Sequence, residues 1–211
     1  MYEAESRSRA HYERRARLYD WANRLAALLR GASQMRERRS AVARLALQPG
    51  ARVLEVSVGT GTNLPLLQER VGPSGSLAGV DISRAMLQRC RDKLRERGLE
   101  AFLVEGEAAH LPFADEAFDA VFHHGGIAEF GDKKGAVDDM VRIARPGARI
   151  VICDVGVPTD RKLSLLSRLL LRVQPEYERP PPLDLMPPNA VGLQLSWFHG
   201  NAWYAIEFVK P

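Results

Sequence analysis

The stretch at residues 51–65 constrains the fold of this chain more than any other part of the sequence. Val53–Val58 is an apolar run interrupted by the acid Glu55 and a serine, and Gly59-Thr60-Gly61 follows it directly. A short apolar run that ends in glycines predicts a buried parallel strand entering a tight turn. Glycine allows positive φ and lets a ligand come close to the backbone, so we expect this turn to contact a ligand.

Strand-like and helix-like segments alternate after this stretch, which predicts βαβ units and a parallel sheet. Two apolar runs around residues 199–201 predict a closing antiparallel hairpin. The expected fold is α/β and Rossmann-like, with a doubly wound, mostly parallel seven-stranded sheet, a C-terminal antiparallel hairpin and N-terminal cap helices. The expected strands are Val53–Val58, Ser76–Asp81, Ala101–Val104, Phe118–Phe122, Arg149–Asp154, Leu193–Phe198 and Trp203–Val209, and the helices between them are Asn63–Arg70, Ser83–Arg97 and Lys134–Ala144.

The N-terminal part differs from the rest in charge. Residues 1–45 hold 11 Arg and 5 acidic residues, whereas the remainder holds 19 basic and 21 acidic residues. Helical periodicity at 9–30 and 33–47 predicts a helical cap over 1–48, belonging to the same domain as a ligand-binding part at 49–211. The basic helices are interpreted either as a membrane-surface contact or as a solvated face. A nucleic-acid binder would spread its positive charge over the fold, so no nucleic-acid partner is expected.

The sequence also predicts a location and excludes one kind of metal site. The N-terminus has no apolar signal region, and no apolar run approaches the roughly 18 residues of a membrane span, so a cytoplasmic protein is expected. The two cysteines are too few for a Cys metal cluster. A leucine-rich segment at 162–173 predicts a helix, and the proline-rich segment at 174–190 predicts an ordered loop over the site.

The glycine turn carries only part of a dinucleotide-binding pattern. Leu64 stands where the third glycine of that pattern would be, and no Lys follows the glycines as in a phosphate-binding P-loop. Asp81 comes about twenty residues later, where a carboxylate can accept both ribose hydroxyls of a nucleoside. No basic residue stands beside the turn in the sequence to neutralise a pyrophosphate. We therefore expect a nucleoside without phosphates, with an NAD-dependent oxidoreductase as the alternative from another class.

Five segments resemble the class I S-adenosylmethionine-dependent methyltransferases in order and spacing, over roughly residues 45–155. They are the glycine turn with its strand at 53–61, the ribose segment at 79–87, the adenine segment at 106–113, the fourth strand at 118–122 and the turn at 143–149. The resemblance implies the fold, the cofactor S-adenosyl-L-methionine and methyl transfer. Ser57 departs from the glycine that the family often has there, and Glu107 replaces a more frequent Asp.

The resemblance also implies roles for individual residues. Glu55 would lie near the amino end of the cofactor, the turn would pass the methionine portion, and Asp81 would hold the ribose hydroxyls. The adenine would lie between Ile82 and Met86, with its polar edge read by Glu107 and the Ala108 amide. The implied cofactor residues are Tyr19, Glu55, Ser57, Gly59, Thr60, Gly61, Asn63, Asp81, Ile82, Met86, Glu107 and Ala108.

Tyr19-Asp20 resembles an element that precedes the glycine turn in the ubiquinone/menaquinone C-methyltransferase-like branch. Tyr19 is interpreted either as a lid over the cofactor or as a core residue.

His123 and His124 are the catalytic candidates, because the carboxyl ends of parallel strands face the ligand in such sheets. Neighbouring side chains on a strand point to opposite faces, so one His at most serves the pocket and no metal pair is expected. Histidine can accept a proton from a phenol, hydroxyl or ammonium. We favour His124 over His123, and a structural histidine remains the alternative. The aromatic residues of the hairpin either line an acceptor pocket or pack on the sheet: Trp197, Phe198, Trp203 and Tyr204.

The function expected from the sequence is an S-adenosylmethionine-dependent methyltransferase acting on a small-molecule or lipid-like acceptor. One alternative is a cofactor-binding protein of the same fold that does not methylate. The acceptor atom is left open between oxygen, nitrogen and carbon.

Overall fold

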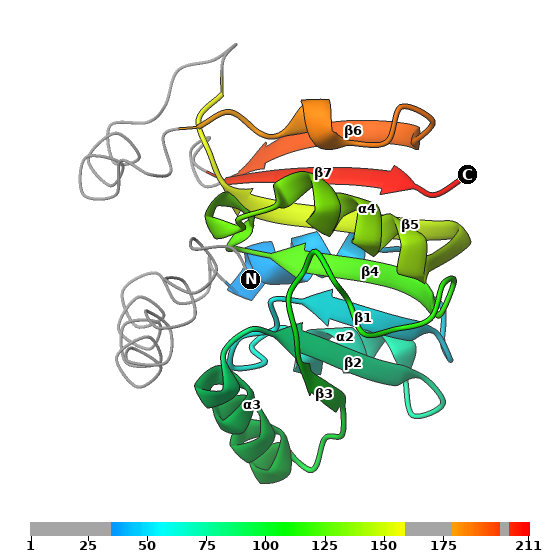
Figure 1. Ribbon diagram of the computed structural model, residues 1–211. Helices are drawn as coiled ribbons and strands as arrows, with labels where there is room; N and C mark the ends of the chain where they lie inside the picture. Colours follow the sequence, from blue (N-terminus) through cyan, green and yellow to red (C-terminus); the bar gives the residue numbers. More distant parts are fainter. Residues whose placement is uncertain (1–34, 159–178, 199–202) are drawn as a thin grey trace.

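The computed structural model describes residues 35–158, 179–198 and 203–211, and its centre is one seven-stranded sheet in the order β3-β2-β1-β4-β5-β7-β6 (Figure 1). Strands β1 to β5 pair in parallel with one another, and β7 is antiparallel to both β5 and β6. The predicted mostly parallel sheet with an antiparallel C-terminal hairpin is confirmed. The strands are β1 Arg52–Val56, β2 Ser76–Asp81, β3 Phe102–Glu105, β4 Phe118–His124, β5 Ala144–Val155, β6 Val191–Phe198 and β7 Trp203–Val209.

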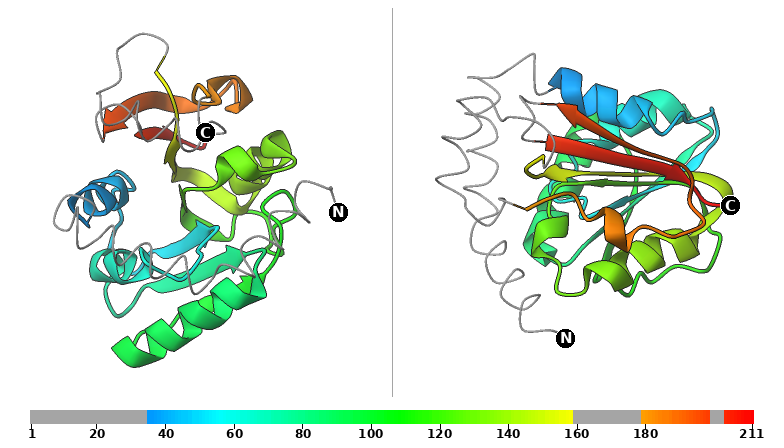
Figure 2. Two further views of the ribbon diagram at one scale, coloured as in Figure 1. Left: turned by 90° about the vertical axis from the view of Figure 1, so that its left-hand side faces the viewer. Right: turned by 90° about the horizontal axis from the view of Figure 1, so that it is seen from above.

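Helices cover both faces of the sheet (Figure 2). A helical segment at 35–43, α2 (Leu64–Val71) and α3 (Arg84–Arg97) bury apolar residues in one core cluster with β1 and β4. Helix α4 (Lys133–Ile143) packs in a second cluster on the other face, against β4, β5 and β7. Because both faces are covered, the central strands read as apolar runs in the sequence.

Two strand ends differ from the prediction. Strand β1 ends at Val56 rather than Val58, because Ser57 adopts a φ of 57° that no strand allows. Strand β4 continues past Phe122 to His124 and pairs with β5 as far as Cys153.

Strand β5 begins at Ala144, although the sequence predicted a start at Arg149. Pro146-Gly147 was interpreted as a turn before the strand. In the structure it lies within β5, as an irregularity in the pairing with β4. The register with β4 shifts there, from Phe118 opposite Ala144 to Ala120 opposite Arg149. The Gly147 amide donates to the carbonyl of Lys210 at 2.8 Å, so the end of the chain supplies the partner that β4 does not.

Several predicted elements lie outside the described residues: the first cap helix at 9–30, the leucine-rich segment at 162–173, and the hairpin turn at 199–201. The described part of the proline-rich segment contains one short 3-10 helix, η3 (Leu183–Leu185). Within the ranges that the structure describes, no helix is long and apolar enough to cross a membrane.

Candidate functional site

A pocket of about 1000 Å³, partly continuous with solvent, lies at the carboxyl ends of β1, β2 and β4. Parallel sheets bind ligands at this edge, where the order of connections reverses beside β1 and β4. Eleven of the residues predicted for the site line it: Glu55, Ser57, Gly59, Thr60, Asn63, Asp81, Ile82, Met86, Glu107, Ala108 and His124. Gly61 and His123 are not among its lining residues, and Tyr19 lies outside the described residues.

Glu55 forms the buried polar end of the pocket. Its side chain is 1% exposed, and its Oε1 atom accepts a hydrogen bond of 2.6 Å from the Asn63 amide. Its Oε2 atom is buried and has no hydrogen-bond partner among the described residues. Burial raises the pKa of Glu55 to about 8, and the Asn63 bond and the nearby Arg38 charge oppose that rise. A buried carboxylate oxygen without a donor is costly, so this atom calls for a cationic or donor group in the pocket.

Arg38 was not predicted from the sequence and lines the same end of the pocket. It donates a hydrogen bond of 2.7 Å to the Asn63 side-chain oxygen, which links Arg38, Asn63 and Glu55 in one chain. Lys93 also reaches the turn from α3, donating to the Thr60 hydroxyl at 2.7 Å. No basic residue stands beside the turn in the sequence, but two segments distant in the chain each bring one to it.

The glycine turn is held open by its backbone. Gly59 has a φ of 54°, and a Cβ atom there would meet nothing within 4 Å, so its face toward the pocket is free for a ligand. Gly61 serves packing instead, because a Cβ atom there would approach the Cys90 sulfur to 2.5 Å. Ser57 also has positive φ, which a side chain makes less favourable.

Asp81 ends β2 and supports the turn from below. Its Oδ2 atom accepts the Gly59 amide at 2.8 Å, and its Oδ1 atom accepts the Ser83 amide at 2.9 Å. Burial raises its pKa to about 6, and these two amides oppose the rise. Each carboxylate oxygen can accept more than one hydrogen bond, so both remain able to receive a hydroxyl from a ligand.

The wall beyond Asp81 is formed by the segment that follows β3. The Gly106 amide donates to the Asp81 carbonyl at 3.1 Å, which fixes the start of this segment beside β2. Glu107 and Ala108 come next and line the pocket together with Ile82, which precedes α3, and Met86 in the first turn of that helix. Two apolar side chains and an acid on one wall are side-chain types that can receive a flat heteroaromatic ring.

The two histidines lie in different surroundings, as the strand alternation predicted. His123 is fully buried, its Nδ1 atom lies 3.0 Å from the Val56 carbonyl, and burial lowers its pKa to about 4. His124 lines the pocket and its ring lies against that of Trp203 in a tilted arrangement, with centroids 5.0 Å apart and planes at 31°. Only His124 is placed to meet an acceptor, and His123 has the position of a neutral structural histidine.

The loop after β4 forms the remaining wall, and its residues from Ile127 onward were not predicted from the sequence. Its short helix η1 (Ile127–Glu129) carries Glu129, which lines the pocket beside Phe130. Asp154 near the end of β5 holds this loop by accepting the Ala128 amide at 3.1 Å. No local signal in the sequence predicts this contact, because Asp154 and Ala128 lie 26 residues apart on different elements.

The residues present fit S-adenosylmethionine. The unpartnered Glu55 oxygen suits its ammonium, the free face of Gly59 leaves room for its chain, and Asp81 suits its ribose hydroxyls. In the part of the chain that the structure describes, no group of three or more His, Cys, Asp or Glu residues could hold a metal ion.

Comparison with known sequences agrees with this geometry. Residues 53–147 match a methyltransferase domain family. The chain is 35% identical to a demethylmenaquinone methyltransferase of Thermus thermophilus, over 72% of this chain and 67% of the relative. It is 37% identical to the demethylmenaquinone methyltransferase of Anoxybacillus flavithermus, over 58% of this chain and 52% of that relative. It is 36% identical to the ubiquinone/menaquinone biosynthesis C-methyltransferase UbiE of Idiomarina loihiensis, over 54% and 47%. The matches thus span about half to two thirds of the relatives' length.

Comparison with solved structures shows the same fold at low identity. A SAM-dependent methyltransferase from Aquifex aeolicus matches with a TM-score of 0.61 and 19% identity, over 82% of this chain and 89% of that one. Phosphoethanolamine N-methyltransferase 2 of Haemonchus contortus, in complex with S-adenosylmethionine, matches with a TM-score of 0.68 and 16% identity, over 83% and 52%. The [4+2]-cyclase SpnF matches with a TM-score of 0.60 and 18% identity, over 83% and 81%.

The sheet order, the pocket and the relatives lead to one assignment. The chain belongs to the class I S-adenosylmethionine-dependent methyltransferases, in the ubiquinone/menaquinone C-methyltransferase-like branch.

Proposed function

We propose that this protein transfers a methyl group from S-adenosylmethionine to a small-molecule, quinone-like acceptor. The observation that carries the proposal is the unpartnered, buried Oε2 atom of Glu55 in the same pocket as Asp81. Together they provide an acceptor for an ammonium at one end and acceptors for a ribose diol further along. The acceptor class is inferred from the names of the relatives.

The cofactor would be held by residues that lie along the pocket in the order of its parts. Glu55 would bind the ammonium, and Arg38 brings positive charge to the same end for the carboxylate. Asp81 would receive the ribose hydroxyls, while Ile82 and Met86 would enclose the adenine. Glu107 and the Ala108 amide would contact the polar edge of the adenine.

Bound S-adenosylmethionine supplies a methyl group activated by a sulfonium, and displacement at that carbon requires in-line alignment more than a dedicated base. His124 is placed to accept the proton that the acceptor loses when its new bond to the methyl carbon forms. The ring of Trp203 lies against that of His124 in a tilted contact at the pocket wall. The loop from Gly125 to Phe130 would separate the reacting atoms from solvent.

The part of the chain before β1 is proposed as a cap over the acceptor side. Ala41, Val42 and Leu45 pack into the core beside α2, so the described end of this part is anchored to the sheet. The basic charge of residues 1–45 would favour contact with an anionic membrane surface, where quinones reside. Vesicle binding that requires anionic lipid would support this contact, and binding that is independent of lipid charge would contradict it.

A second candidate is a protein of the same fold that binds the cofactor without methylating. The structural likeness to a [4+2]-cyclase shows that this fold also serves other chemistry. A catalytic base does not separate the two candidates, because methyl transfer can proceed without one; transfer of a labelled methyl group does.

The test uses S-adenosylmethionine with a labelled methyl group, a demethylated hydroquinone, and a phenol and an amine as competing acceptors. We expect label on the hydroquinone, with kcat reduced about 100-fold in His124→Gln, the usual contribution of a general base. S-Adenosylhomocysteine should bind both variants equally. Tight binding of S-adenosylhomocysteine without transfer to any acceptor would favour the second candidate.

A further inference from the structure

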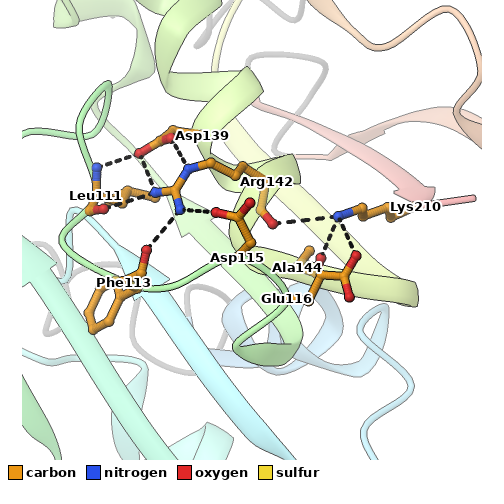
Figure 3. Close-up of polar contacts among 8 residues, drawn as sticks. All are labelled: Leu111, Phe113, Asp115, Glu116, Asp139, Arg142, Ala144 and Lys210. Carbon is orange, nitrogen blue, oxygen red and sulfur yellow. Dashed lines mark hydrogen bonds and ion pairs between the residues drawn. The ribbon is translucent and has the colours of Figure 1, made fainter.

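Arg142 lies on α4, outside the pocket, and makes an unusually complete set of contacts (Figure 3). Its Nε atom donates to Asp139 at 2.6 Å, and Nη2 donates to the other oxygen of Asp139 at 3.1 Å. Nη2 also donates to the Leu111 carbonyl at 3.0 Å. Nη1 donates to the Phe113 carbonyl at 2.8 Å and to Asp115 at 2.7 Å. A guanidinium has five N–H donors, and each has an acceptor here.

Asp139 completes the arrangement from the same helix. It accepts the Leu111 amide as well as two donors of Arg142, so both the amide and the carbonyl of Leu111 are bound to α4 (Figure 3). Leu111 itself is 4% exposed and packs in the core with α4. The charged Asp139 and Asp115 raise the pKa of Arg142, which therefore stays protonated at any pH the fold survives.

Leu111 is one end of the segment that forms the adenine wall. At the other end, the Gly106 amide is bound to the carbonyl of Asp81. Between these two anchors lie Glu107, Ala108 and Ala109, all of which line the pocket. The segment is a bridge fixed at both ends, and its far anchor consists of two side chains that never reach the ligand.

We infer that Arg142 is a positioning residue for the cofactor, acting through Asp139 and Leu111 to hold Glu107–Ala109 in their ligand-bound arrangement. The inference rests on the cofactor site of the proposed function. Without this anchor, the segment Glu107–Ala109 becomes ordered only when the nucleoside binds. The entropy lost in that ordering reduces the binding free energy, so the affinity falls. The transfer step takes place at the opposite end of the pocket and keeps its rate.

The experiment compares Arg142→Gln and Arg142→Lys with the wild-type protein by calorimetric titration of S-adenosylhomocysteine and 5′-methylthioadenosine. We expect both ligands to bind about tenfold more weakly to Arg142→Gln, the factor for ordering about one further residue. Arg142→Lys should recover only part of this, because a lysine cannot form the paired contacts. In methyl-transfer assays, KM for S-adenosylmethionine should rise about tenfold while kcat stays within twofold.

Lys134→Ala is the matched control on the same helix. Lys134 forms an exposed i,i+4 ion pair with Asp138 and does not contact the bridge, so its loss should leave both affinities unchanged. Asp115→Asn should have a small effect, because Asp115 is 75% exposed and accepts one Arg142 donor.

Hydrogen exchange separates positioning from loss of fold. In Arg142→Gln, amides of 107–111 should exchange faster, while amides of β1 keep their protection. Unchanged affinity for both ligands in Arg142→Gln, or equal loss of protection in β1, would overturn the inference. If the wild-type protein bound neither ligand, the cofactor assignment itself would be wrong, which is a different result.

Discussion

Two carboxylates at the same edge of the sheet hold two neighbouring loops in the same way. Asp81 at the end of β2 accepts the Gly59 amide of the loop after β1 and the Ser83 amide two residues further along its own segment. Asp154 near the end of β5 accepts the Ala128 amide of the loop after β4 and its own Val155 amide. In each case an acid at the end of one strand binds the loop that follows the neighbouring strand.

The two acids differ in what else they reach. Asp81 lines the pocket, so its remaining lone pairs face a ligand, whereas Asp154 is 1% exposed and is not among the lining residues. Burial raises the pKa of both to about 6. The difference teaches that a loop-holding acid becomes a binding residue only when the loop leaves it open toward the cavity.

The largest expected effect comes from Asp81→Ala. It should weaken S-adenosylhomocysteine binding more than 100-fold, about 3 kcal/mol, because two charge-assisted hydrogen bonds to the ribose are lost. Calorimetric titration measures this directly, and Asp154→Ala is the counterpart that should stay within about threefold. Near-normal binding by Asp81→Ala would remove the functional difference between the two acids.

Asp81 could be predicted from the sequence, and Asp154 could not, for a physical reason. Asp81 follows a glycine turn at a spacing that ribose binding by such folds requires, so the pattern is local. Asp154 and Arg38 bind partners about 25 residues away on other elements, and Arg142 reaches the Leu111 carbonyl 31 residues away. Such pairings depend on how those elements pack. The five parallel strands were predictable because each is a local apolar run.

The sequence also left choices that only packing could make. Strand alternation predicted that one of His123 and His124 faces the pocket, but the choice depends on the register of β4 with β1 and β5. The start of β5 was misplaced because Pro146-Gly147 has the composition of a turn. Its actual partner, the carbonyl of Lys210, lies at the other end of the chain.

The second effect concerns stability. Asp154→Ala should lower the free energy of unfolding by about 2 kcal/mol, because buried backbone amides lose their acceptor. Urea unfolding at neutral pH measures it. Asp119→Ala is the matched control: Asp119 also accepts a backbone amide, that of Arg52 at 2.7 Å, but its side chain is 30% exposed, so water can replace it. Equal losses in the two variants would mean that burial does not set the cost.

The third effect is a pH dependence of the unfolding free energy. The pKa of Asp154 rises from 3.8 to about 6 on folding, so the folded protein holds this proton more tightly than the unfolded chain. Its stabilising contribution is complete below pH 3.8 and is lost as the pH rises through about 6. Stability should therefore fall across this range, and in Asp154→Asn the fall should be smaller. Identical slopes in urea unfolding series would contradict this assignment.

The smallest effect tests the backbone of the two loops. The loop after β4 turns on Gly125 and Gly126, with φ of 87° and 105°, whereas the loop after β1 places Ser57 at 57°. Ser57→Gly should raise the free energy of unfolding by about 1 kcal/mol, since a side chain is disfavoured in the left-handed region. Gly126→Ser is the reverse substitution, and a Cβ atom there meets nothing within 4 Å, so any loss comes from the backbone alone. Chemical unfolding of both variants measures the pair. Destabilisation by Ser57→Gly would show that contacts of the serine side chain stabilise the loop by more than its positive φ costs. The two loops would then differ in side-chain contacts rather than in glycine content.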